Sequence, residues 1–197
     1  DAVAEFEDVE LSNDGGFVYR PGQGNKRIPD ERSRTTGKRI PQSYGMMSYA
    51  GLKTFLLLNV GKDDPKVQSA WKWVTKNYTL DENCKLGARG LYYYYMTMAK
   101  ALAAYGERYV ETSADHRKHD WAKELSDRLV NTQWENGQWV NRKSSEWMES
   151  DPVLVTAYAV RTLKICQKFL QEHPNGQAAK SAAGAEKPPA PAASEAK

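Results

Sequence analysis

Two histidines, His116 and His119, stand three residues apart in a polar stretch that begins at Glu107. Two imidazoles at this spacing could hold a metal ion weakly at the surface. The polarity of the stretch favours a structural interpretation, in which both histidines are solvent-exposed residues at the start of a helix. No metal site is therefore expected.

The two cysteines, Cys84 and Cys166, are far apart in the sequence and form no cluster with the spacing of metal ligands. Free thiols, buried or half-buried, are the favoured interpretation, and a disulfide stays open. No cofactor is expected from these residues.

The segment Thr132–Asn141 contains a Gln, three spacer residues, a Gly, one residue and a Trp, at Gln133, Gly137 and Trp139. Gly137 allows a left-handed residue in a tight reversal at a helix end. The Gln133 amide can hydrogen-bond unpaired backbone groups of a neighbouring helix terminus. The Trp139 ring offers a flat apolar surface that closes the turn. These residues are expected to stabilise structure; the alternative is an ordinary turn with incidental tryptophans.

The elements that position these residues are predicted to be helices. Ser43, Asp63 or Asp64, and Asp151 can cap helix N-termini, and Gly61 and Gly106 mark helix ends. Apolar residues recur at three- and four-residue intervals and predict helices at 43–60, 65–78, 90–105, 120–133 and 151–170.

These helices alternate in character. Those at 43–60, 90–105 and 151–170 are apolar nearly all round, whereas 65–78 and 120–133 are apolar on one side. Leu52 matches Leu102, and Trp71 matches Trp121, at a separation of about 50 residues. The pattern predicts an array of helical hairpins, with the apolar helices in an inner ring and the amphipathic ones in an outer ring.

Both ends of the chain differ from this repeat region. Residues 21–41 are rich in Gly, Pro, Arg and Lys, which favours a poorly ordered surface loop. From His173 onward the chain is mostly Ala, Pro, Glu, Lys and Gly, which predicts a disordered tail. We therefore divide the chain into 1–41 (a degenerate turn motif and a long loop), 42–172 (the repeats) and 173–197 (the tail).

Charge and hydropathy bear on the partners. The 197 residues carry 28 basic and 25 acidic side chains, a formal net charge of +3, which gives no support for nucleic acid as a partner. No apolar run approaches the roughly 20 residues that span a bilayer, so no transmembrane segment is expected. No targeting signal indicates a compartment.

Several of these segments together resemble one family. The Gln133–Trp139 motif looks like the Gln-Trp repeat of the squalene cyclase and prenyltransferase repeat family. The segments that begin Ser43-Tyr44-Gly45-Met46, Gly90-Leu91-Tyr92-Tyr93 and Asp151-Pro152-Val153-Leu154 resemble inner helices of that family, and Asp14-Gly15-Gly16-Phe17 resembles a degenerate Gln-Trp motif. The resemblance covers roughly residues 15–171.

The resemblance implies an all-α fold, an α/α toroid in which helical hairpins build an inner and an outer barrel. Two complete pairs and one further inner helix are too few to close such a ring. We therefore expect an incomplete ring and an N-terminal portion that precedes Asp1.

The family's chemistries imply little catalysis in this segment. Its triterpene cyclases protonate an alkene or epoxide with an Asp-x-Asp-Asp motif, because the proton donor must be an unusually acidic carboxyl. Glu149 and Asp151 are the nearest candidates here, but Pro152 replaces the second adjacent carboxylate. The prenyltransferases bind zinc through Asp, Cys and His, and Asp81-x-x-Cys84 has the wrong spacing for that site.

Apart from these catalytic motifs, the resemblance implies an interior lined by aromatic side chains. The family places its cavity wall on the inner helices, which implies ligand contacts for Tyr44, Tyr49, Tyr93, Tyr94 and Tyr158. Core packing, with hydroxyls bonded to inter-helix backbone, is the alternative for most of them. The expected function is a non-catalytic toroid module that binds an apolar ligand or a protein partner. The alternative is a terpenoid cyclase whose acid lies in a preceding segment.

Overall fold

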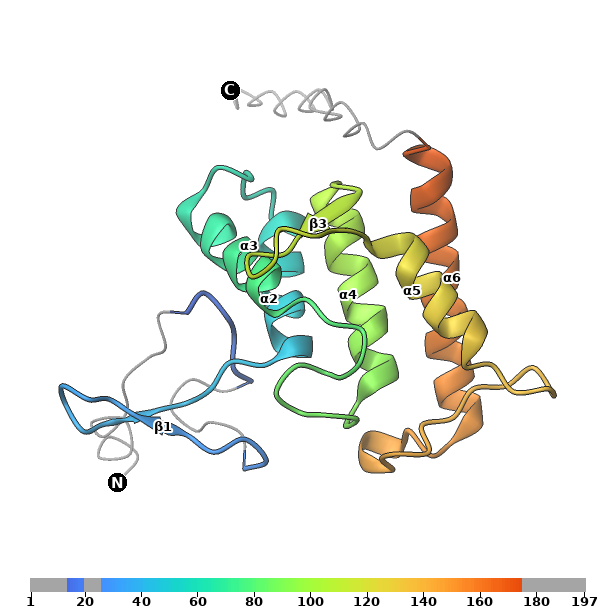
Figure 1. The fold of residues 1–197 in the computed structure, drawn as a ribbon, viewed down its shortest axis with the longest axis horizontal. Coiled ribbons are helices and arrows are strands. Elements are labelled where there is room, and N and C mark those ends of the chain that lie inside the picture. Colours follow the sequence, from blue (N-terminus) through green and yellow to red (C-terminus); the bar gives the residue numbers. More distant parts are fainter. Residues whose placement is uncertain (1–13, 20–25, 175–197) are drawn as a thin grey trace, which may run out of the picture.

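The computed structural model describes residues 14–19 and 26–174, and helices dominate them (Figure 1). Each predicted helix is present to within a few residues at either end. The helices are α2 (Gly45–Leu57), α3 (Pro65–Asn77), α4 (Leu91–Tyr105), α5 (Trp121–Asn131) and α6 (Pro152–Glu172), with a short 3-10 turn η1 (Glu146–Met148) before α6. The protein is therefore mostly helical, as predicted.

Side-chain caps explain several helix starts. Asp64 accepts a hydrogen bond from the Lys66 N–H, and Asp151 accepts one from the Val153 N–H, both at 2.8 Å. Each is followed by a proline in the first helical turn, where the missing N–H costs nothing. These two predicted caps are confirmed.

The predicted cap at Ser43 was wrong. Tyr44 occupies the N-cap of α2 and makes no side-chain capping bond. Ser43 is fully buried instead, where its hydroxyl accepts from the Trp73 indole N–H at 2.8 Å and donates to Asp14 at 2.6 Å. A distant partner thus overrides the local capping preference.

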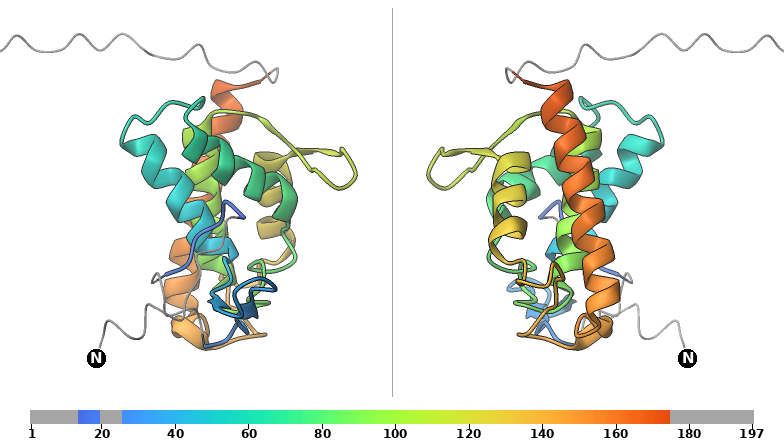
Figure 2. Two further views of the ribbon diagram at one scale, coloured as in Figure 1. Left: turned by 90° about the vertical axis from the view of Figure 1, so that its left-hand side faces the viewer. Right: turned by 90° about the vertical axis from the view of Figure 1, so that its right-hand side faces the viewer.

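The helices form two layers. In the first layer α4 lies between α2 and α6, and in the second layer α3 packs on α2 while α5 packs on α6. Figure 2 shows α3 and α5 on the same side of the three-helix layer. The core lies between the layers and is rich in large side chains that are almost wholly inaccessible: Trp73, Trp121, Tyr49, Tyr94, Leu102 and Leu125.

The three helices of the first layer, α2, α4 and α6, are not equally buried. Most side chains of α4 are buried, as its composition predicts. The segments 43–60 and 151–170 are also apolar nearly all round, yet they are only partly buried, because Leu57 and Leu58 are 68% and 70% exposed and Val153 is 78% exposed. Parts of the apolar surface of α2 and α6 are therefore open to solvent.

Two short hairpins were not predicted. In the first, β1 (Glu31–Arg32) pairs with β2 (Arg39–Ile40), and Ile28 beside it packs on Tyr44. Poor order was therefore the wrong prediction for 26–41; residues 21–25 of that loop lie outside the described residues.

In the second hairpin, β3 (Tyr109–Glu111) pairs with β4 (Lys118–Asp120). Arg108 ties it to the end of α6, because its guanidinium donates to Asp120 at 2.7 Å and to the His173 carbonyl at 2.6 Å. His173 is buried, so the packed region extends past the predicted boundary at 172. The remainder of the predicted tail, 175–197, lies outside the described residues.

The repeat is less regular than a 50-residue period. Leu52 of α2 and Leu102 of α4 are both fully buried. Trp71, however, lies in the middle of α3 and stacks on Tyr105 with ring centroids 3.8 Å apart, whereas Trp121 opens α5. The two tryptophans are therefore not equivalent, and that match was wrong.

Candidate functional site

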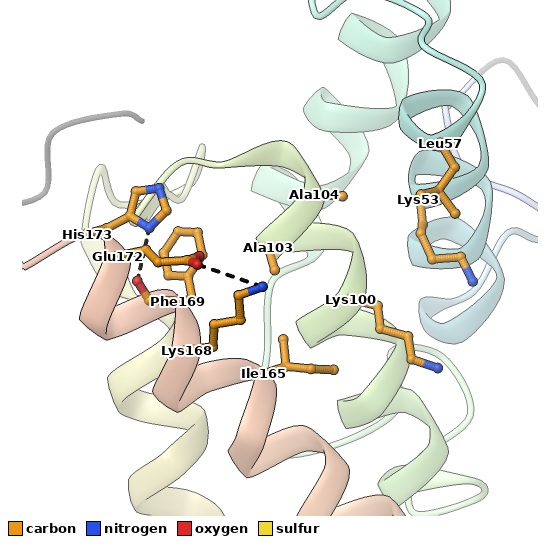
Figure 3. A pocket seen from close by; sticks show the side chains of 10 residues that line it. All are labelled: Lys53, Leu57, Lys100, Ala103, Ala104, Ile165, Lys168, Phe169, Glu172 and His173. Atoms are coloured by element: carbon orange, nitrogen blue, oxygen red, sulfur yellow. Dashed lines mark hydrogen bonds and ion pairs between the residues drawn. The ribbon is translucent and has the colours of Figure 1, made fainter. Parts of the chain in front are cut away.

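A groove lies at the C-terminal ends of α2, α4 and α6, on the side of the three-helix layer that α3 and α5 leave uncovered (Figure 3). We call it the C-terminal groove. Its volume is about 540 Å³, within the range of roughly 300–1,000 Å³ that is typical of small-molecule sites. Five of its ten lining residues are apolar: Leu57, Ala103, Ala104, Ile165 and Phe169.

The groove is hollow because α4 contributes only small side chains to its floor. Figure 3 shows Ala103 and Ala104 between the side chains of α2 and those of α6. An alanine ends at its Cβ atom, so it cannot fill the space between two larger neighbours. The result is an apolar depression rather than a packed helix interface.

Three lysines stand around this depression: Lys53 from α2, Lys100 from α4 and Lys168 from α6. Lys168 lies 3.7 Å from the Glu172 carboxylate. Within the part of the chain that the structure describes, no ion pair engages Lys53 or Lys100. Burial lowers the pKa of Lys100, and the positive charges of Arg161 and Lys53 lower it further. The groove therefore carries an excess of positive charge.

His173 closes one end of the groove. Its ring stacks on Phe169 with centroids 4.0 Å apart, and its Nδ1 lies 2.9 Å from the Phe169 carbonyl oxygen. Its Nε2 is buried and has no hydrogen-bond partner among the described residues. An unpaired polar atom in an apolar setting costs free energy.

The candidate tyrosines divide into two groups. Tyr93 and Tyr158 come together at the open face of α4 and α6, edge to face with ring centroids 5.7 Å apart, and Tyr93 is 41% exposed. Tyr44, Tyr49 and Tyr94 are buried in the core. Three of the five candidates are therefore core residues, and neither Tyr93 nor Tyr158 lines the C-terminal groove.

Buried tyrosine hydroxyls bond to the backbone of the loop that precedes α4. Tyr94 donates to the Thr79 carbonyl at 2.8 Å, and Tyr95 donates to the Leu80 carbonyl at 2.6 Å. Burial raises the pKa of both phenols above the ordinary value. Both hydroxyls are therefore structural donors.

The weak catalytic candidates Glu149 and Asp151 are both engaged in capping. Asp151 caps α6. Glu149 is fully buried, where it accepts from the Tyr93 N–H at 2.9 Å and from the Asn141 amide at 2.7 Å. Burial raises the pKa of Glu149 and these donors oppose the shift. Glu149 therefore accepts hydrogen bonds from backbone N–H groups at the start of α4, and it lines none of the described cavities.

The Gln-Trp segment holds together the turn after α5. Trp139 is buried and its indole N–H donates to the Leu129 carbonyl at 2.8 Å, at the last turn of α5. Gly137 has a φ of +82°, as its predicted left-handed role requires, but it lies in a turn several residues beyond the helix end. The exposed Gln133 amide donates to the Gly137 carbonyl at 2.8 Å, within its own loop. Among the described residues, this amide makes no hydrogen bond to a neighbouring helix terminus, which differs from the prediction.

The two histidines do not start a helix. His116 is exposed in the turn of the second hairpin, with a φ of +53°. His119 lies in β4, half-buried against Tyr78 and 3.0 Å from the Glu124 carboxylate. The described residues contain no group of three or more His, Cys, Asp or Glu side chains that could hold a metal ion.

Both cysteines are free and buried. Burial raises the pKa of the Cys84 thiol to about 11 and that of the Cys166 thiol to about 12. Neither is a thiolate near neutral pH, so neither is suited to nucleophilic catalysis.

A second cavity of about 870 Å³ lies among loops near η1. Its charged groups are partly neutralised, since the Arg89 guanidinium lies 3.2 Å from the Glu146 carboxylate. The C-terminal groove is the better candidate because it has an apolar floor on rigid helices.

Sequence reasoning missed the groove lysines. A signal was present for two of them, because Lys53 and Lys100 are the single charged residues of α2 and α4. Reasoning from sequence also missed Asn83, whose buried amide accepts from the Met46 N–H at 3.0 Å and caps α2 as Glu149 caps α4.

Comparison of the chain with protein-family models, curated proteins and solved structures found no match. None of the described helices combines the length and apolar character needed to cross a membrane. The fold and the groove define a mostly helical protein with an open, apolar and basic face.

Proposed function

We propose that the chain is a squalene cyclase and prenyltransferase-like α/α toroid module, non-catalytic in its described residues, and that it binds an apolar small molecule in the C-terminal groove. The observation that carries the proposal is an exposed apolar groove on the face that a toroid would turn toward its centre. A small molecule is preferred to a protein partner because the groove has the volume of a small-molecule site.

Two turn motifs support the toroid arrangement. Gly15 and Gly137 have nearly the same φ, +83° and +82°. Two residues later, the Phe17 N–H donates to the Ser48 hydroxyl at 3.0 Å, and the Trp139 N–H donates to the Thr156 hydroxyl at 3.1 Å. Each motif thus fastens a turn to the first turns of an inner helix, which is what a degenerate and a complete copy of one motif would do.

A pair of matched variants tests the binding site. Leu57 and Val130 are both exposed apolar residues on helices, at 68% and 59%, but only Leu57 lines the groove. We expect saturable binding of the neutral dye Nile red, followed by its fluorescence. Leu57→Asp should weaken it about fivefold or more, since an apolar contact of about 1 kcal/mol is replaced by a charge.

Val130→Asp serves as the control and should leave the dissociation constant unchanged. Absence of saturable binding would contradict the proposal and would favour a protein partner. Equal losses in the two variants would show that the dye binds elsewhere.

The terpenoid cyclase alternative requires a proton donor that faces the substrate. Among the described residues, the only carboxylate that lines the groove is Glu172, which is paired with Lys168. We therefore expect no cyclic product when the protein is incubated with squalene and the extract is examined by gas chromatography. A cyclic product would overturn the non-catalytic assignment.

A further inference from the structure

The C-terminal groove combines two chemistries on opposite sides. Ile165 and Phe169 of α6 form an apolar side, and Figure 3 shows the amino groups of Lys53 and Lys100 on the side of α2 and α4, directed the same way. The two alanines of α4 lie between these sides. An occupant that spans the groove therefore meets Ile165, Phe169 and the Lys168–Glu172 ion pair on the α6 side, and on the other side two lysines that no carboxylate of the described residues neutralises.

The positive charge on this side is not neutralised within the described chain. Among the described residues, Glu172 is the only carboxylate that lines the groove, and it pairs with Lys168 on the α6 side. Arg161, on the same helix, adds repulsion toward Lys100. An anion placed between Lys53 and Lys100 would relieve this repulsion and would gain charge-assisted hydrogen bonds.

From this charge complementarity we infer that the ligand of the groove is a single-chain amphiphile with an anionic head. The head binds Lys53 and Lys100, and the hydrocarbon tail lies over Ala103 and Ala104 against Ile165 and Phe169. This inference rests on the proposed function and narrows the apolar ligand to one chemical class.

Lysines near helix C-termini also stabilise a helix through its dipole, and that role needs no ligand. The two roles predict opposite effects of Lys100→Met, which keeps the apolar stem and removes the charge. If Lys100 stabilises α4 through the helix dipole, the variant should lower the melting temperature. If Lys100 is an unneutralised ligand-binding charge, the variant should raise the melting temperature and weaken binding of the anion.

The experiment compares dodecanoate, dodecyl phosphate and 1-dodecanol, each below its micellar concentration, as competitors of Nile red on the full chain. Both anions should bind at least tenfold more tightly than the alcohol, and added NaCl should weaken only the anions. Lys100→Met should weaken dodecanoate about tenfold and leave the alcohol unchanged. Lys72→Met, on the exposed side of α3, is the matched control.

Ala104→Trp tests the tail independently of charge. The indole should fill the hollow and weaken the alcohol and the anions alike, at an exposed helical position where folding is not at risk. Equal affinity for dodecanol and dodecanoate would overturn this inference and leave the proposed function standing. Failure of the three compounds to displace bound Nile red would overturn this inference alone, whereas absence of saturable Nile red binding as well would overturn both.

Discussion

At the scale of single residues, Glu149 shows how a sequence pattern can suggest chemistry that the fold uses for structure. The residue is fully buried and its carboxylate accepts hydrogen bonds at the start of α4. The two residues before it, Trp147 and Met148, both have left-handed backbone, with φ of +54° and +63°. Such strain costs about 1–3 kcal/mol per residue and persists only where surrounding contacts hold it.

This buried carboxyl predicts a pH effect on stability. Burial raises the pKa of Glu149 above 4.5 in the folded chain. Its contribution to the free energy of unfolding is therefore fully present below about pH 4.5 and is lost as the pH rises through the folded pKa. Urea denaturation gives the free energy of unfolding of the natural protein and of Glu149→Gln at each pH. The difference between the two should shift in favour of the natural protein as the pH falls from 7 toward 4.5. A difference that does not change with pH would contradict this assignment.

Removing the Glu149 carboxyl should cost more unfolding free energy than removing an ordinary helix cap. Glu149→Ala removes the carboxylate that accepts hydrogen bonds from the Tyr93 N–H and the Asn141 amide. Loss of this buried acceptor should cost about 2–4 kcal/mol of unfolding free energy. Asp151→Ala removes an exposed cap and should cost about 1 kcal/mol. Urea denaturation of both variants checks the order; equal losses would mean that Glu149 is no more than a surface cap.

At the scale of elements, the Gln-Trp segment acts through Trp139. The buried Trp139 ring bonds to the end of α5 through its indole N–H, and the Trp139 backbone N–H bonds to Thr156 near the start of α6. Trp134 is partly exposed, and the Arg142 guanidinium carbon lies 3.6 Å from the centre of its ring. Trp139→Ala should cost about 3–5 kcal/mol and lower the melting temperature. Trp134→Ala should cost about 1 kcal/mol or less. If Trp139→Ala left the melting temperature unchanged but abolished ligand binding, the segment would be a binding site rather than a structural clamp.

Helix signals in this chain were predictable because they are local. Asp64 and Asp151 each precede a proline at the first turn, and Gly106 ends α4 with a φ of +78°. The two hairpins were missed because their strands are two or three residues long and their stability comes from pairs such as Arg108 with Asp120, which sequence spacing does not reveal.

At the scale of the molecule, the open face of α2, α4 and α6 was not foreseeable. Sequence patterns indicate which helices are apolar, but the side of a helix that stays uncovered depends on its neighbours. The tyrosines illustrate the limit, because Tyr93 and Tyr94 are adjacent and only Tyr93 reaches the open face. The groove lysines were missed for the same reason.

The central claim is that an anionic amphiphile lies in the C-terminal groove. Its most direct test is photo-crosslinking with a long-chain carboxylate that carries a diazirine on its tail, followed by mass spectrometry of the labelled peptides. We predict saturable labelling of α4 around Ala103 and of α6 around Ile165 and Phe169, and competition by dodecanoate. Labelling confined to α3 or α5, or labelling that dodecanoate does not displace, would contradict the claim.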